Sequence, residues 1–307
     1  MMNFGPVLCA TFFVVWSVGL LAADETLANM LLINGVVQLV LFVFVACIPF
    51  LKTGRMSFVD IAWPFGVALI GLQIAVLGDG DMVRRLCVAG IYMLIGLRMG
   101  VGALAMARST GVIVRTEFPR YQYRRLQLAN DGEGAARFHM LAEILAQGFA
   151  NASVLALPGF LIAVNGQPGF HGWEVAGLGM WLLAYGLEST ADLQKLKFIS
   201  RNKGGVCNVG LWRYSRHPNY FSEWLVWSGL VIAAVPSWMA LEQAESTFVW
   251  IVLGAGGATA SVMMYITLVY LTGAIPAEYY SVRKRPEYKR YQETTSMFFP
   301  WFPKGPA

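Results

Sequence analysis

The chain has 307 residues, of which 57 % are hydrophobic and only 13 % are charged. A soluble globular domain carries about a quarter charged residues, so this composition excludes an ordinary soluble protein. The formal net charge is +5. No folded basic module accompanies that charge, which therefore indicates attraction to anionic lipid headgroups or an anionic ligand, not to nucleic acid.

Apolar runs long enough to cross a bilayer, roughly 20 residues each, recur along the whole chain. They predict an all-α, polytopic transmembrane bundle that forms a single membrane domain over residues 1–307. A signal peptide also begins with an apolar run, but the first run here lacks a basic segment and a clear cleavage site, so we expect a retained membrane helix. The eight predicted spans are residues 5–22, 28–51, 57–77, 86–107, 140–164, 173–192, 218–240 and 248–274.

The positions of lysine and arginine predict the orientation. With a cytoplasmic N-terminus, loops 52–56, 108–139 and 193–217 and the tail from 275 hold 20 of the 23 basic residues. We therefore expect both termini in the cytoplasm, in a bacterial inner membrane or, in a eukaryote, the endoplasmic reticulum. The longest loop contains TEFPRYQYRR, which suits a short interfacial helix.

Cysteine and histidine show no metal signature. Cys9, Cys47 and Cys87 lie in predicted spans and Cys207 in a loop, without a CxxC pair. The three histidines fall in three different loops, without an HExxH pair. We expect neither a disulfide framework nor a metal site.

Ionisable side chains inside membrane spans are costly and by default mark sites or pathways. Glu188 and Asp192 are four residues apart on one helix face, which Tyr185 shares, and Asn219 and Glu223 share a face of the next helix. All such groups fall in the cytoplasmic half of the spans, which predicts a water-accessible cleft open to the cytoplasm. The ionisable residues in predicted spans are Asp60, Arg98, Glu143, Glu188, Asp192 and Glu223.

Some of these groups have a simpler explanation. Asp60 and Glu143 lie near span ends, where a carboxylate reaches interfacial water. Arg98 is the deepest of the set, and it either serves a site or only neutralises Asp60 or Glu188.

The stretch GLWRYSRHPNYFSE, residues 210–223, places basic residues directly before an apolar helix. Pro218 suits the first turn of a helix, since its missing N–H would be unpaired there. The positive end of that helix would face the loop carrying Arg213, Arg216 and His217, an arrangement suited to a phosphate or pyrophosphate.

Asn219 and Glu223, farther along the same helix, can hold a neutral polar head by hydrogen bonds. Tyr220 beside them is either part of that site or an interfacial aromatic residue. Phosphates at the mouth and a flat polar ring deeper in describe a pyridine nucleotide.

Four stretches resemble the steroid 5-alpha-reductase C-terminal-domain family. YSRHPNYFSEWLVWSG, from Tyr214, is similar to the family signature SRHPNYFGE followed by an apolar helix. ESTADLQKLKF, the tail from Pro276 and FVDIAWPFG, from Phe58, are similar to further family segments, the last to a signature of a bacterial branch. The likeness covers about residues 55–303 and is strongest over 185–300, so residues 185–303 are the family-like half.

The resemblance implies a membrane reductase that uses NADPH to saturate a carbon–carbon double bond conjugated to a ketone. Its substrate would be a lipid or steroid-like enone from the bilayer, with NADPH between the sixth and seventh spans and the tail folded over it. The glutamate and tyrosine with which animal steroid enzymes hold the ketone are not found in the first half, which leaves Asp60, Arg98 and, more weakly, Tyr92.

The 2′-phosphate of NADPH needs a basic partner, for which Arg283 is a further candidate. The candidate catalytic residues are Glu223, Arg98, Asp60 and Tyr280, and the candidate cofactor-binding residues are Glu188, Asp192, Lys195, Lys197, Arg201, Arg213, Arg216, His217, Asn219 and Tyr220.

Two alternatives remain open. Membrane methyltransferases of the isoprenylcysteine carboxyl type, which use S-adenosylmethionine, share an RHPxY segment, but their tails pair two adjacent glutamates, whereas Glu278 stands alone in AEYY. A non-enzymatic lipid-binding or transport role is the other. Transporters often have inverted repeats with broken helices, and neither is evident in this sequence.

Overall fold

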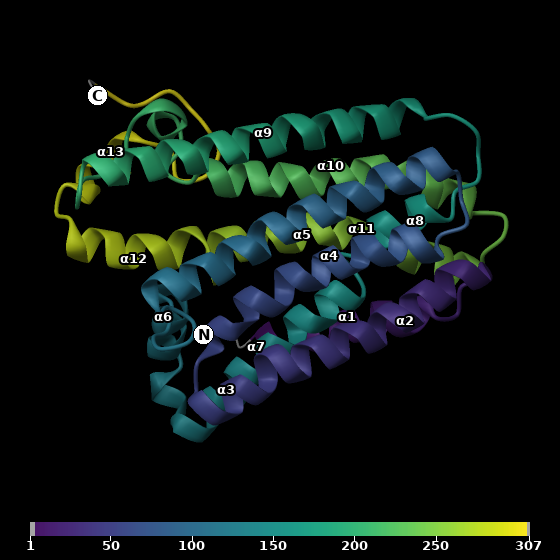
Figure 1. Ribbon diagram of the computed structural model, residues 1–307, viewed down its shortest axis with the longest axis horizontal. Helices are drawn as coiled ribbons and strands as arrows, with labels where there is room; N and C mark the ends of the chain where they lie inside the picture. Colours follow the sequence, from purple (N-terminus) through teal and green to yellow (C-terminus); the bar gives the residue numbers. More distant parts are fainter. Residues whose placement is uncertain (1–3, 306–307) are drawn as a thin grey trace. The chain divides into compact units, whose positions relative to one another are not determined.

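The computed structural model describes residues 4–305 (Figure 1). Within that range every regular element is a helix, and extended backbone pairs only in an isolated bridge between Val112 and Thr116. The predicted all-α class is confirmed. The elements are α1 (Phe4–Gly19), α2 (Glu25–Phe42), the π-helix η1 (Val43–Cys47), α3 (Ile48–Thr53), the 3-10 helix η2 (Met56–Phe58), α4 (Val59–Leu77), α5 (Met82–Thr110), α6 (Pro119–Gln127), η3 (Ala129–Asp131), α7 (Glu133–Ala152), α8 (Leu157–Ala163), α9 (Gly172–Arg201), η4 (Gly210–Arg213), α10 (Pro218–Ala240), α11 (Thr247–Ile266), the π-helix η5 (Thr267–Leu271), α12 (Ala274–Lys284) and α13 (Tyr288–Thr294).

Local sequence sets several helix ends. Asp24 accepts a hydrogen bond of 2.8 Å from the backbone N–H three residues on and caps α2, and Asp81 caps α5 in the same way at 2.9 Å. Such caps satisfy N–H groups that have no partner inside the helix. Gly54 after α3 and Gly111 after α5 both have φ of 72°, a left-handed conformation that glycine adopts without strain. Pro218 begins α10, as predicted.

Six helical segments in the described range are long and apolar enough to cross a membrane. Each of the eight predicted spans is largely helical, but α1 has only 16 residues and α9, with 30, carries Glu174 and Glu188 among its apolar residues. The chain is an integral, multi-pass membrane protein, while the number of eight spans and the orientation stay predictions. The six segments are Glu25–Thr53, Met56–Leu77, Met82–Thr110, Glu133–Ala163, Pro218–Ala240 and Thr247–Lys284.

The predicted span 140–164 is interrupted. α7 ends at Ala152 and α8 begins at Leu157, and Ser153 between them has φ −125° and ψ −94°, outside the helical region. The predicted span is present as part of the candidate span Glu133–Ala163, with a break that the sequence analysis did not predict. Pro158, in the first turn of α8, is the physical reason, because its ring would clash with the carbonyl four residues earlier in a continuous helix.

Side chains from neighbouring helices satisfy the backbone at this break. Asn34 of α2 donates through Nδ2 to the carbonyls of Asn151 and the following residue, at 2.9 and 3.2 Å. The hydroxyl of Tyr92 of α5 donates to the Leu155 carbonyl at 2.7 Å and accepts a backbone N–H of α8 at 3.1 Å. Within a bilayer, backbone polar groups must be satisfied by the protein itself. Tyr92, a weaker candidate for the ketone, here supports the break.

Contacts divide the chain into two compact units. Unit 1 comprises the residues up to Val175 and Val231–Ala260, and unit 2 comprises Ala176–Leu230 and the residues from Ser261 onward. The boundaries fall inside α9, α10 and α11. All the predicted cofactor-binding residues belong to unit 2, whereas Arg98 and Asp60 belong to unit 1.

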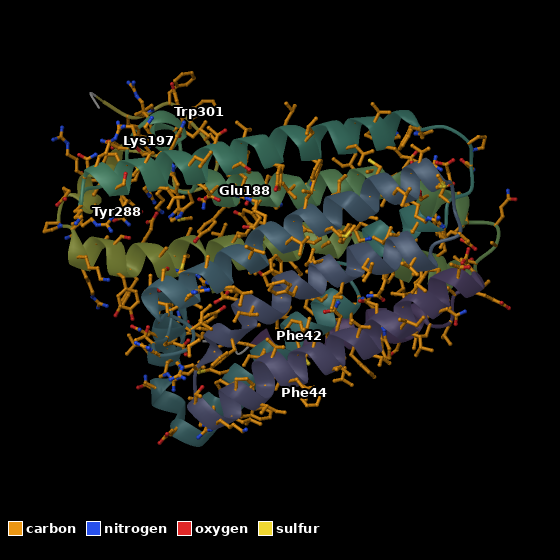
Figure 2. All side chains as sticks on the ribbon, in the orientation of Figure 1. Phe42, Phe44, Glu188, Lys197, Tyr288 and Trp301 are labelled. Atoms are coloured by element: carbon orange, nitrogen blue, oxygen red, sulfur yellow. The ribbon has the colours of Figure 1, made fainter. Side chains whose placement is uncertain are left out.

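Buried aliphatic and aromatic residues of α2, η1, α4 and α7 form a core in unit 1. Phe42 is 1 % exposed and lies in this core, whereas Phe44, two residues on, is 66 % exposed and points away from the unit (Figure 2). An apolar outer face of this kind is expected where helices contact lipid.

Uncharged amides hold three helices of unit 1 together. Gln38 Nε2 donates to Asn34 Oδ1 and to the Gly66 carbonyl, both at 3.0 Å, and Gln73 Nε2 donates to Asn34 Oδ1 at 3.1 Å. A Cβ at Gly66 would lie 2.3 Å from the Asn151 amide nitrogen, so glycine is required for this approach. Such interhelical hydrogen bonds between small and amide residues favour helix association in membranes.

Arg84, which the sequence assigns to an outer loop, is almost completely buried near the start of α5. Its Nε donates to Glu174 Oε1 at 2.6 Å, and its Nη1 donates to the carbonyls of Asn165 and Gln167 at 3.0 and 2.7 Å. Both charged side chains are 2 % exposed. Because a buried charge needs a partner, this pair fixes the chain segment between α8 and α9 onto α5.

In unit 2, α9 and α10 lie side by side (Figure 1). A Cβ at Gly229 of α10 would lie 2.7 Å from the Gly177 carbonyl of α9, so the two backbones approach closely only because this residue is glycine. Trp212 donates through Nε1 to the Ala191 carbonyl at 2.9 Å and attaches the loop before α10 to α9.

Candidate functional site

A buried carboxylate, Glu278 of α12, is the centre of a polar cluster in unit 2. Arg216 Nε donates to Glu278 Oε1 at 2.7 Å and Nη2 to Oε2 at 3.1 Å, a bidentate pair. His217 Nε2 lies 3.0 Å from Oε1, and Gln292 Nε2 donates to Oε2 at 2.6 Å. Glu278 is only 7 % exposed, so these contacts supply the charge and hydrogen bonds that a buried carboxylate requires.

Arg216 also attaches the loop before α10 to the end of the chain. Its backbone N donates to the Ser296 carbonyl at 2.8 Å, and its Nη1 donates to the carbonyls of Gln292 and Thr295 at 2.9 and 2.5 Å. The hydroxyl of Tyr291 donates to the Trp212 carbonyl. The contacts of Arg216 are therefore structural. Binding of a phosphate by Arg216 stays a prediction, and it would require Arg216 to release one of these partners.

His217 lies at the start of α10, stacked on Tyr220 with 5.2 Å between the ring centroids and 5° between the planes. Burial lowers the pKa of His217 below its usual value, and the neighbouring Glu278 carboxylate opposes this only in part. His217 is consequently neutral near pH 7.

A second polar group lies between α9 and α10 of the same unit. Asn219 Nδ2 donates to Asp192 Oδ1 at 3.1 Å. α9 and α10 run antiparallel. Glu188 lies one turn before Asp192 on α9, and Glu223 lies one turn after Asn219 on α10, so the two glutamates lie opposite each other. Glu188 and Glu223 are 7 % and 9 % exposed. The structure thus brings together the two helix faces that the sequence singled out.

Asn219 has one atom left for a ligand. Its Oδ1 is buried and has no hydrogen-bond partner within residues 4–305. Because the Nδ2 atom is already bonded to Asp192, the orientation of the amide is defined, and the oxygen is the free acceptor.

Basic residues surround this end of α9. Lys195 Nζ lies 4.2 Å from the centroid of the Trp212 ring, a cation–π contact, and burial lowers the pKa of Lys195. Arg283 lies over the ring of Tyr279 at 3.6 Å. Tyr280 of α12 is half-buried, with its ring centroid 5.0 Å from that of Tyr279. The remaining predicted cofactor-binding cations are exposed, namely Lys197, Arg201 and Arg213.

In unit 1, helix α6 supplies partners for the predicted interfacial acids. Asp60 accepts hydrogen bonds from Arg120 Nη2 at 2.8 Å and from the Tyr121 hydroxyl at 3.0 Å. Arg124 Nε donates to Glu143 at 2.7 Å. The Arg124 contact accounts for Glu143, whereas both contacts of Asp60 end on Oδ1, and its buried Oδ2 has no hydrogen-bond partner in the described chain. Catalysis by Asp60 stays a prediction.

Arg98, on α5 of unit 1, is half-buried. Its action on a substrate carbonyl stays a prediction.

Sequence reasoning expected the tail, with its polar stretch from Glu278, to fold over the sixth and seventh spans, but it gave no role to Gln292 or Tyr291. The sequence did contain a signal for the ion pair. A charged residue at the start of an apolar span needs a partner of opposite charge, and Arg216 stands directly before the apolar helix α10. What the sequence lacked was the position of α12 relative to that loop.

A family model described as a protein of unknown function (DUF1295) matches residues 50–295. The chain belongs to this family. It is also 26 % identical to an uncharacterized protein of Schizosaccharomyces pombe over 169 residues, 48 % of this chain and 45 % of that protein. The chain thus spans less than half the length of this curated relative. No solved structure matches the chain. The residues matched to the family include all the candidate site residues, from Asp60 to Tyr280, and the Glu278 cluster.

Proposed function

We propose that this protein is a membrane-embedded reductase that uses NADPH to saturate a carbon–carbon double bond conjugated to a ketone. The substrate is an apolar enone from the bilayer. The resemblance of residues 185–303 to the steroid 5-alpha-reductase C-terminal domain supports the proposal, as does membership of a family of membrane proteins distantly related to those enzymes.

The observation that carries the proposal is the polar layer between α9 and α10. Asn219 of α10 donates to Asp192 of α9, and Glu188 and Glu223, one turn away on the same two helix faces, are buried acids. A purely structural helix pair in a membrane has no need of four such groups, because burying them is costly.

The donor set fits a nicotinamide nucleotide. Asn219 Oδ1 is a buried acceptor that has no hydrogen-bond partner in the described chain. The N–H of the nicotinamide carboxamide is a donor that can bind it. Glu223, one turn deeper, supplies a further acceptor. The exposed cations Lys197, Arg201 and Arg213 suit the phosphates, which Arg216 cannot contact while it is paired with Glu278.

Bound NADPH would supply the hydride for the β-carbon of the enone and become NADP⁺, and a proton from water would complete the saturated ketone at the α-carbon. Asn219 and Glu223 would orient the carboxamide of the nicotinamide ring, and the exposed cations would hold the phosphates. A hydrogen-bond donor directed at the ketone oxygen stabilises the charge that develops there. Tyr280, in the same unit as Asn219 and Glu223, has a hydroxyl that can be that donor, whereas the roles of Arg98 and Asp60 of unit 1 stay sequence-based predictions.

The test is a binding assay on the purified protein in detergent. Its thermal stability is followed while NADPH, NADH or S-adenosylmethionine is added. Stabilisation by NADPH, and less by NADH, is the expected result. Stabilisation by S-adenosylmethionine alone would replace the reductase with a methyltransferase.

The substrate class is tested with membranes that contain the protein. They are incubated with NADPH and a panel of lipid and steroid-like enones, and products are searched by mass spectrometry for a gain of two hydrogens. Glu223→Gln membranes at equal protein content are the control, and they should lose the product.

A further inference from the structure

The last residues of the described chain present large aromatic side chains to the outside of unit 2. Trp301 and Phe302 are 71 % and 74 % exposed, and Phe299 is 52 % exposed. Tyr214, in the loop before α10, lies beside them, with its ring centroid 6.0 Å from that of Phe302. The rings of Tyr214 and Trp301 both lie next to that of Phe302, and an exposed aromatic surface of this kind marks an interaction site. These three side chains are called the aromatic patch.

The patch is held in place by hydrogen bonds. Trp301 N donates to the Tyr214 carbonyl at 2.9 Å, and Lys304 N donates to the Thr294 carbonyl at 2.8 Å. Ser215 Oγ donates to the Phe298 carbonyl at 2.9 Å. The tail is therefore fixed to the loop before α10, and its aromatic rings are exposed by a defined backbone.

The two chain segments that carry the patch contain only basic charged residues, and the acidic residues nearest to them in the chain are Asp192, beside Leu193, and Glu293, beside Thr294. Residues 193–217 contain six lysines and arginines and no acidic residue, and residues 294–305 contain one lysine and no acidic residue. Lys197 and Trp301 are visible at the same end of unit 2 (Figure 2). The exposed cations of these two segments are Lys197, Arg201, Lys203, Arg213 and Lys304.

The patch also has a defined depth. Tyr214 precedes Pro218 by four residues, and Pro218 begins a helix able to cross the membrane. The patch therefore lies at the level where that span leaves the bilayer. Tryptophan and other aromatic residues favour this level, and cations there attract anionic headgroups.

We propose that the aromatic patch docks the tail onto the headgroup layer of a membrane that contains anionic phospholipid, with Lys304 contacting the phosphates. The docked tail supports the Glu278 cluster, because the Ser296 and Thr295 carbonyls bind Arg216. The inference does not depend on NADPH or on any reaction.

The experiment measures the surroundings of Trp301 in nanodiscs. Its emission is obtained as the difference between the unaltered protein and Trp301→Phe. Discs of phosphatidylcholine, with or without phosphatidylglycerol, are probed with brominated acyl chains, which quench from inside the bilayer, and with acrylamide, which quenches from water. We expect quenching by the brominated lipid, protection from acrylamide, and stronger protection with phosphatidylglycerol.

One variant and one control residue test the docking further. Lys304→Gln, which lies outside the proposed cofactor site, should weaken docking on anionic discs by about fivefold, the value of one cation near such a surface. Trp173, 58 % exposed at the start of α9 and next to Glu174, is the matched control, since its emission should not respond to phosphatidylglycerol.

Two outcomes would overturn the proposal. Equal acrylamide quenching of Trp301 in both kinds of disc, without quenching by brominated lipid, would place the patch in water. Protection from both quenchers would mean that protein covers it, as in an association of two copies.

Discussion

Arg216 and Glu278 are 62 residues apart in the chain and form a bidentate ion pair, with N–O distances of 2.7 and 3.1 Å. Arg216 belongs to the loop that opens α10, and Glu278 belongs to α12. Their side chains are 10 % and 9 % exposed, so the pair is largely removed from water. It therefore fixes α12 against the loop that precedes α10.

Removing the charge of Glu278 should destabilise unit 2 strongly. Glu278→Gln leaves the buried Arg216 without its counter-charge, for which the expected cost is about 3–5 kcal/mol. The measurement is the thermal unfolding midpoint in detergent, compared with Glu287→Gln, an exposed glutamate before α13. Equal midpoints for the two variants would show that the ion pair does not hold the tail.

Acidification should destabilise the protein through His217. Its pKa in the folded protein is lowered from 6.5 by burial, so the unfolded chain binds the proton first. The contribution is complete above 6.5 and is lost as the pH falls from there toward the lower folded pKa. The unfolding midpoint of the unaltered protein should drop over this range, and that of His217→Gln should drop less. Parallel profiles would assign the pH dependence to other groups.

Asn219→Ala should weaken NADPH binding by about two- to tenfold, the effect of one hydrogen bond, and should lower the unfolding midpoint only modestly, through the lost bond from Nδ2 to Asp192. The reason is that Asn219 Oδ1 has no hydrogen-bond partner in the described chain, and in the proposal it accepts a hydrogen bond from the ligand. The matched control is Asn202→Ala, an exposed amide at the end of α9. A large loss of stability with normal NADPH affinity would make Asn219 structural.

Tyr92→Phe should lower the free energy of unfolding by about 1–3 kcal/mol, because a buried carbonyl and a buried N–H at the break between α7 and α8 lose their partner. Tyr270→Phe, at a position 52 % exposed, is the control and should change little. Both are compared by thermal unfolding in the same detergent. If Tyr92→Phe unfolds like the unaltered protein, water replaces the hydroxyl at the break.

The class of this protein follows from its apolar runs alone. Runs of about 20 apolar residues cross a bilayer as helices, because a helix satisfies most of its backbone N–H and C=O groups within its own segment. The start of α10 at Pro218 followed from the missing N–H of proline. The shared face of Glu188 and Asp192, and that of Asn219 and Glu223, followed from the helical period alone.

Which residues are partners is known only from the packing of the helices. The sequence predicts that Arg216 is a cation available for phosphate, but in the structure it donates to Glu278 and to carbonyls of the tail. Arg84 reads as a loop residue and is buried against Glu174. The partner of a charge lies far away in the chain, and helical periodicity contains information about neighbours within a helix but not between helices. Pairings between helices depend on the close approaches that glycines such as Gly229 and Gly66 permit, and these exist only in the packed protein.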